Sequence, residues 1–133
     1  MPAVTNLPER IGRYQVERLL GRGAMGLVCR AHDPDIDRPV AIKLILADLL
    51  AGEDRDAWVA RFRREAKAAG RCMHPNIVAV YDVSVHEGNP FLVLEYVEGA
   101  SLRDALDQGR RVSPGKAIAI MGQVLDALAC AHG

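Results

Sequence analysis

Three glycines and one lysine are the residues of this chain best suited to hold a phosphate group. Gly21, Gly23 and Gly26 follow the spacing G-x-G-x-x-G, and Lys43 ends the segment Val40-Ala41-Ile42-Lys43. Glycine has no Cβ and tolerates positive φ, so successive backbone N–H groups in such a loop can approach phosphate oxygens closely. The Lys43 ammonium would supply the matching charge. The spacing therefore predicts one half of a nucleotide-binding site.

The segments that flank the glycines indicate which kind of loop this is. The same glycine spacing opens dinucleotide-binding folds, in which the loop leads from a strand into a helix. Here residues 14–20 alternate in part between apolar and polar types, and residues 27–32 alternate again before the turn signal Asp33-Pro34-Asp35. Alternation on both sides predicts a hairpin between two strands. A hairpin without a ligand remains the simpler alternative at this point.

Lys43 needs a partner if its strand is buried. The segment around it is apolar on both faces, which is typical of a buried strand, and an unpaired buried ammonium is costly. A helix is expected over about residues 54–71, and Trp58, Phe62 and Glu65 share one stripe of it. We therefore expect Glu65 on the buried face, in an ion pair with Lys43. An edge-strand lysine that reaches water is the alternative.

Several motifs, in the correct order, resemble the amino-terminal part of a protein kinase. Residues 21–28 resemble the glycine-rich loop, residues 40–43 the lysine motif, and Glu65 the glutamate of the αC helix. His74-Pro75-Asn76-Ile77-Val78 resembles the connection after that helix, and residues 91–99 resemble the strand and hinge that follow. The form of the glycine-rich loop is most similar to bacterial eukaryotic-like (Hanks-type) serine/threonine kinases. The resemblance extends from Arg13 to the end of the chain.

The resemblance implies ATP as the ligand, with Mg²⁺ in the full-length family, and it assigns roles to single residues. Leu20, Val28 and Ala41 would cover adenine, Leu94 would be the gatekeeper, and the backbones of Glu95 and Val97 would bind the purine edge. The ATP-binding residues implied in this way are Leu20, Gly21, Arg22, Gly23, Ala24, Met25, Gly26, Leu27, Val28, Ala41, Lys43, Leu94, Glu95 and Val97, with Glu65 in support. Without the motif order, ordinary core would be the preferred interpretation of the apolar members.

The patterns and the resemblance together predict an α+β fold. We expect a kinase-like small lobe of five antiparallel strands and one helix, then the hinge and the first helices of an incomplete large lobe. Ser101 predicts the start of a helix that ends near Gln108-Gly109, and Ser113-Pro114 predicts the start of another, which resembles αE. The expected organisation is a flexible lead-in over 1–12, small lobe and hinge over 13–97, and the start of the large lobe over 98–133.

The motifs with which kinases transfer phosphate do not occur in these 133 residues: there is no H-R-D and no D-F-G. No catalytic residue and no metal ligand is therefore assigned, and we expect the chain alone to be catalytically incompetent and to bind ATP weakly or not at all. The favoured hypothesis is a serine/threonine kinase truncated before its catalytic loop. The alternative is a non-catalytic module that binds a nucleotide or a partner, associating through the exposed face of the helix from Ser113. The motif at 74–76 and the hinge argue against a kinase-like enzyme of small molecules.

Composition restricts the class of protein. Seventeen basic residues balance seventeen acidic ones, which gives no electrostatic case for nucleic acid or an anionic membrane as partner. The three cysteines, Cys29, Cys72 and Cys130, show neither a disulfide nor a zinc spacing, so we expect core thiols and a reducing cytoplasm. No signal peptide and no membrane-spanning segment is evident. A protein substrate is implied only by the resemblance.

Overall fold

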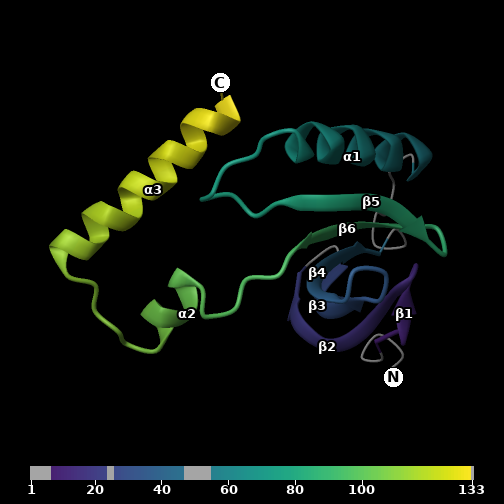
Figure 1. The fold of residues 1–133 in the computed structure, drawn as a ribbon, viewed down its shortest axis with the longest axis horizontal. Helices are drawn as coiled ribbons and strands as arrows, with labels where there is room; N and C mark the ends of the chain where they lie inside the picture. The colour runs from purple at the N-terminus through teal and green to yellow at the C-terminus, as the bar shows by residue number, and fades with distance from the viewer. Residues whose placement is uncertain (1–6, 24–25, 47–54, 133) are drawn as a thin grey trace. The chain divides into compact units, whose positions relative to one another are not determined.

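A computed structural model describes residues 7–23, 26–46 and 55–132, which form one antiparallel sheet and three helices (Figure 1). The strands are β1 (Arg10–Ile11), β2 (Tyr14–Arg22), β3 (Gly26–Asp33), β4 (Arg38–Ile45), β5 (Val80–His86) and β6 (Asn89–Glu95), in the spatial order β1-β2-β3-β4-β6-β5. The helices are α1 (Arg55–Gly70), α2 (Leu102–Asp107) and α3 (Pro114–His132). The predicted α+β class is confirmed, with one strand more than the five expected.

The additional strand is β1, in the segment that was predicted to be a flexible lead-in. Ile11 pairs with Tyr14 of β2 and is fully buried, and the Val16 N–H donates to the Glu9 carbonyl at 2.9 Å. Gly12, at φ +60°, makes the tight turn between the two strands. The prediction is therefore wrong for residues 10–11, because a strand of two residues is too short to show alternation. Residues 1–6 lie outside the described part of the chain.

The chain divides into two compact units. The first comprises residues 1–71 and 79–96 and contains the sheet and α1, and the second comprises residues 72–78 and 97–133 and contains α2 and α3. In the first unit α1 packs against β5 and β6. Strand β5 begins at Val80, after a turn in which the Ile77 N–H donates to the His74 carbonyl at 3.1 Å.

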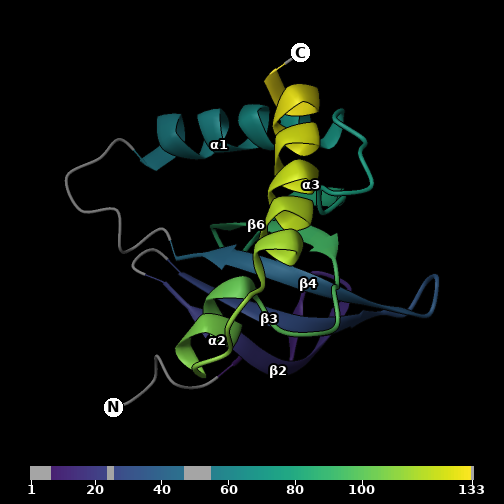
Figure 2. The same ribbon diagram turned by 90° about the vertical axis from the view of Figure 1, so that its left-hand side faces the viewer.

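The core of the first unit lies on one face of the curled sheet (Figures 1 and 2). Along β3 buried residues alternate with half-buried ones, as expected for a strand with one face in the core. The core face carries Ile11, Tyr14, Leu27, Cys29, Ala31, Val40, Ile42, Leu44, Phe91 and Val93. The prediction of a core thiol is thus confirmed for Cys29, and burial raises its pKa to about 11. The opposite face of β3 and β4 lies outside this core cluster.

A buried carboxylate at the end of β3 is held by an arginine. Asp33 is only 2% exposed, and its two carboxylate oxygens accept from Arg13 Nε at 3.4 Å and Nη2 at 3.2 Å. The hydrogen bond from Arg13 lowers the pKa of Asp33, against the opposing effect of burial. The same hydrogen bond raises the pKa of Arg13. This bidentate pair fixes the start of β2 to the end of β3.

The two helices of the second unit begin where their sequence signals predict. The Ser101 hydroxyl accepts from the Asp104 N–H at 3.0 Å, and Gly109, at φ +78°, follows the end of α2. The Ser113 hydroxyl accepts from the Lys116 N–H at 3.2 Å, and Pro114 is the first residue of α3. Both predicted helix starts are confirmed. None of the described helices is long and apolar enough to cross a membrane.

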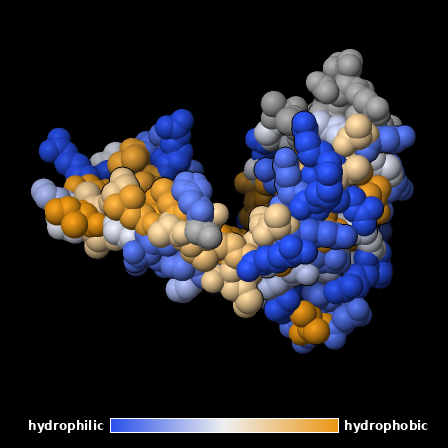
Figure 3. All heavy atoms as spheres, turned by 90° about the horizontal axis from the view of Figure 1, so that it is seen from above, coloured by the Kyte–Doolittle hydropathy of each residue, from blue (hydrophilic) through white to orange (hydrophobic). Residues whose placement is uncertain are grey.

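The apolar side chains of α3 are exposed. They are Ile118, Met121, Val124, Leu125 and Leu128, with exposed fractions between 43% and 74%. Figure 3 shows hydrophobic residues gathered over this helix. A helix that is apolar around most of its circumference normally packs within a larger body.

Candidate nucleotide-binding site

The glycine-rich segment joins two paired antiparallel strands. Gly21 pairs with Val28 and Arg22 with Leu27 across β2 and β3, and the Gly23 N–H donates to the Gly26 carbonyl at 2.8 Å. This hairpin excludes the dinucleotide-binding alternative, which requires a helix after the loop. The predicted site residues Ala24 and Met25 lie outside the described residues.

The three glycines serve different physical needs. None of them is among the described glycines with positive φ. At Gly26 a Cβ would overlap the Leu44 carbonyl oxygen and lie 3.1 Å from Ile45 Cα, so the close approach of β4 excludes a side chain there. At Gly21 and Gly23 a Cβ would meet no atom within 4 Å. Those two glycines leave space at the surface that a ligand can use.

A cavity of about 410 Å³ lies at the glycine loop and contains Lys43. It is lined by Gly21, Arg22, Gly23, Gly26, Leu27, Val28, Lys43 and Ile45. The structure thus brings seven predicted site residues together around one cavity. Sequence reasoning missed Ile45, although it lies two positions beyond Lys43 on β4, and residues two apart in a strand point to the same face.

The register of the strands explains why these side chains share a face. Val28 pairs with Lys43 across β3 and β4, and Ala41 pairs with Leu94 across β4 and β6. Directly opposed residues of antiparallel strands project to the same side of the sheet, and so do residues two apart. Val28, Ala41, Lys43 and Leu94 therefore share the face opposite the core, and none of them belongs to the core cluster. Val28, Ala41 and Leu94 are half-buried and lie outside this core cluster.

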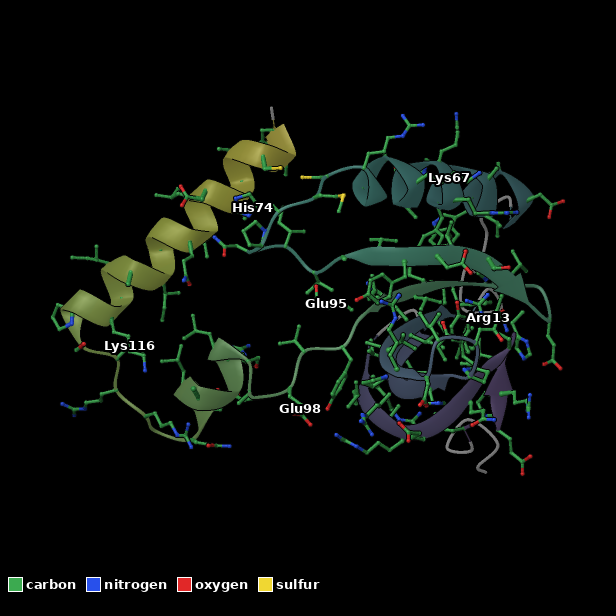
Figure 4. All side chains as sticks on the ribbon, viewed as in Figure 1. Arg13, Lys67, His74, Glu95, Glu98 and Lys116 are labelled. Carbon is green, nitrogen blue, oxygen red and sulfur yellow. The ribbon has the colours of Figure 1, made fainter. Side chains whose placement is uncertain are left out.

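Of the residues predicted for the adenine end of the site, Val28 lines this cavity, whereas the lining does not include Leu20, Ala41, Leu94, Glu95 or Val97. Leu20 lies at an irregularity of β2 between Leu19 and Gly21 and is 39% exposed. The Glu95 N–H donates to the Ala79 carbonyl at 2.9 Å, and its carboxylate accepts from the Ala79 N–H at 3.1 Å (Glu95 is labelled in Figure 4). Val97 is 62% exposed and belongs to the second unit.

The expected buried ion pair is not formed. Lys43 and Glu65 are both exposed, and the salt bridges found among the described residues do not include one between them. The prediction that Glu65 lies on the buried face of the helix is wrong. The Lys43 side chain is exposed, as in the alternative of an edge-strand lysine, but β4 is not an edge strand because it pairs with both β3 and β6.

The orientation of α1 explains this difference. Its inward face carries the buried Ala66 and the half-buried Val59, Phe62 and Gly70, and the position of a Gly70 Cβ lies 3.7 Å from Val80 Cβ. Glu65 precedes Ala66 by one residue, which turns its side chain by about 100° around the helix. The stacked rings of Trp58 and Phe62, 5.3 Å apart, reinforce this face.

The lining residues suit a phosphate better than a metal ion. The cavity offers the backbone of a glycine loop and one exposed ammonium, the groups that hold phosphate oxygens. Among the described residues that line it, no side chain is a carboxylate, an amide or a hydroxyl. Because Mg²⁺ requires oxygen ligands, these described side chains do not fit the metal.

Comparison with known proteins places the chain among kinases. The family model described as "Protein kinase domain" matches residues 14–133. A probable serine/threonine-protein kinase of Streptomyces coelicolor is 42% identical over 131 residues, which are 94% of this chain and 19% of that protein. Serine/threonine-protein kinase PrkC of Bacillus subtilis is 40% identical over 121 residues, 91% of this chain and 18% of that protein. The crystal structure of the Mycobacterium tuberculosis PknI kinase domain matches with a TM-score of 0.76 and 32% identity, over 92% of this chain and 48% of that one.

Proposed function

The chain belongs to the protein kinase family, and from this premise we propose that it is the N-terminal, nucleotide-holding portion of an ATP-dependent serine/threonine protein kinase. The chain spans about a fifth of the length of the curated relatives, so the activity of a whole kinase is part of the proposal. The observation that carries it is the cavity in which Gly21, Gly23 and Lys43 come together. Protein substrates and a cytoplasmic location are proposed with it.

In this proposal the glycine loop and Lys43 hold the phosphates of ATP. Gly21 and Gly23 allow close approach because no side chain stands between the backbone and the ligand. Val28, Ala41 and Leu94 offer an apolar face for the flat base, and such sites combine a dry apolar slot with few polar groups.

A nucleotide titration followed by NMR tests the proposal. ATP added to the isotope-labelled chain should shift the amide signals of the glycine loop, and adenosine should shift them much less because it has no phosphates. We expect Lys43→Met to weaken the ATP response at least several-fold, since it removes the ammonium group that lines the cavity. Lys67→Met is the matched control, because Lys67 is an exposed lysine of α1 that does not line this cavity (Figure 4). Equal responses of the two variants would contradict the proposal.

Phosphate transfer needs residues that these 133 positions do not contain. An aspartate that orients the acceptor hydroxyl and ligands for the metal are required, and neither H-R-D nor D-F-G occurs here. We therefore predict that the purified chain transfers no radiolabelled phosphate to a protein substrate. Transfer that is lost in Lys43→Met would refute this prediction.

The second candidate is a non-catalytic module that binds a nucleotide or a partner protein. The exposed apolar side chains of α3 favour it, because a solvent-facing apolar helix is stabilised when another protein surface covers it. The two candidates differ in the continuation of the gene: an H-R-D-encoding sequence that follows supports the kinase.

A further inference from the structure

Two of the three cysteines, 58 positions apart in the sequence, are in direct contact in the second unit. Cys72 Sγ and Cys130 Sγ lie 2.8 Å apart, and both residues are half-buried. Cys72 lies two residues beyond the end of α1, and Cys130 lies in the last turn of α3. The prediction of core thiols is wrong for this pair. We propose that Cys72 and Cys130 form a redox modification site, which a hydroperoxide converts into an intramolecular disulfide.

A second contact holds the two thiols in place. The Asn76 side-chain amide donates to the Gln123 carbonyl at 3.1 Å, about two turns of α3 before Cys130. Segment 72–78, on which His74 is labelled in Figure 4, is therefore attached to α3 at two points. A disulfide has an S–S distance of about 2.05 Å, so the sulfur atoms need to approach by only about 0.8 Å.

The chemistry balances with a hydroperoxide as the only oxidant. The Cys130 thiolate attacks one peroxide oxygen, an S–O bond forms, the O–O bond breaks, and the other oxygen leaves as water after protonation. The Cys72 thiolate then attacks the sulfenic acid sulfur, the S–S bond forms, and the S–O oxygen leaves as a second water. Two thiols and one hydrogen peroxide give one disulfide and two waters. Because either sulfur can be the donor in the contact between them, the same balance holds with the two cysteines exchanged.

The disulfide would close a long loop. It would connect the segment directly after α1 to the last turn of α3 and enclose β5, β6 and α2. In a reducing cytoplasm such bonds are transient and report oxidants, whereas structural disulfides occur in oxidising compartments. The site is independent of the proposed function, because it uses no residue of the nucleotide cavity.

Peptide mapping of the 133-residue chain tests the proposal. The reduced chain is treated with a small molar excess of hydrogen peroxide, alkylated under denaturing conditions and cleaved with trypsin without reductant. Cleavage after Arg71, Arg103 and Lys116 places Cys72 in peptide 72–103 and Cys130 in peptide 117–133. We expect these two peptides to be disulfide-linked, and Cys29, in peptide 23–30, to be alkylated. The oxidised chain should be monomeric and melt several degrees higher, and dithiothreitol should reverse both changes.

Single-cysteine variants separate this pair from unspecific oxidation. Cys29→Ser should keep the linked peptides. Cys72→Ser should remove them and leave a sulfenic acid on Cys130 that dimedone traps. If Cys72→Ser does not fold, the mapping of Cys29→Ser decides alone. Linkage of Cys29 to either partner, disulfides only between chains, or three alkylated thiols after peroxide would each overturn the proposal.

Discussion

Replacing Gly26 by alanine should destabilise the first unit strongly, whereas the same change at Gly21 should not. The Gly26 Cβ would overlap the Leu44 carbonyl oxygen and lie 3.0 Å from the Leu44 carbonyl carbon. These are backbone atoms of β4, which no rotamer change can move away. At Gly21 the added methyl group meets no atom within 4 Å. The two variants carry the same chemical change five positions apart in one hairpin.

The size of the expected loss of stability follows from the separation of β3 from β4 that the alanine side chain requires. To make room, β3 has to move away from β4 at the pairs Gly26↔Ile45 and Leu27↔Leu44, where β4 is buried. Losing about two ladder hydrogen bonds costs about 1–3 kcal/mol, and disturbed packing adds about 1–3 kcal/mol. Alanine also lowers the conformational entropy of the unfolded chain, which stabilises the folded state by about 0.4–1 kcal/mol and offsets part of this loss. We therefore expect Gly26→Ala to lower the free energy of unfolding by about 2–4 kcal/mol.

The assay is urea unfolding of the two variants side by side, followed by far-UV circular dichroism and by the fluorescence of Trp58, the single tryptophan of the chain. Gly21→Ala should stay within about 0.5 kcal/mol of the parent or exceed it slightly, because only the unfolded-state effect remains. It should still weaken the response to ATP, since its methyl group enters the cavity. Equal stabilities of Gly21→Ala and Gly26→Ala would refute the packing argument.

Three further outcomes are expected. Because Arg13 lowers the pKa of Asp33 in the folded state, the pair stabilises the fold above about pH 4, and this stabilisation is lost as the pH falls through the folded pKa. Asp33→Asn should therefore lower the urea midpoint at pH 7, and the midpoint of this variant should decrease less in acid than that of the parent. Cys29, with a pKa of about 11, should resist iodoacetamide at about pH 8 until urea unfolds the chain, and native alkylation would contradict its burial. Lys43→Met should change the free energy of unfolding by no more than about 0.5 kcal/mol, because Lys43 is exposed; a loss above about 1 kcal/mol would indicate an ion pair in solution.

Local signals predicted most of the fold, whereas the contacts between distant segments escaped them. The caps at Ser101 and Ser113 act within one helical turn, so their sequence positions were sufficient. The pairing of Ile11 with Tyr14 depends on a turn of two residues, and too few residues are involved for a pattern. Cys72 and Cys130 are separated by two strands and two helices. No spacing rule connects residues that far apart, and only the folded chain brings them into contact.

The helix that carries Glu65 shows how one assumption can choose the wrong face. Two stripes of the helix are possible. One contains Trp58, Phe62 and Glu65, and the other contains Val59, Phe62 and Ala66. Because both contain Phe62, helical periodicity alone does not decide between them. The choice of Glu65 came from the assumption that Lys43 is buried and needs a carboxylate. The run around Lys43 is apolar on both faces, but only one of them is packed in the core.

In the proposed function, the second apolar face of β4 would contact a ligand instead of the core. Val28, Ala41 and Leu94 lie outside the core on the face that carries Lys43, and Val28 also lines the cavity of the glycine loop. A nucleotide base would exclude water from such a face only while it is bound. A strand face of this kind needs apolar residues just as a permanently buried face does, so the two give the same hydrophobic pattern in the sequence. A strand that is apolar on both faces and carries one charge therefore has two physical explanations. Where the charge faces a glycine hairpin, as Lys43 does, the ligand explanation needs no buried carboxylate.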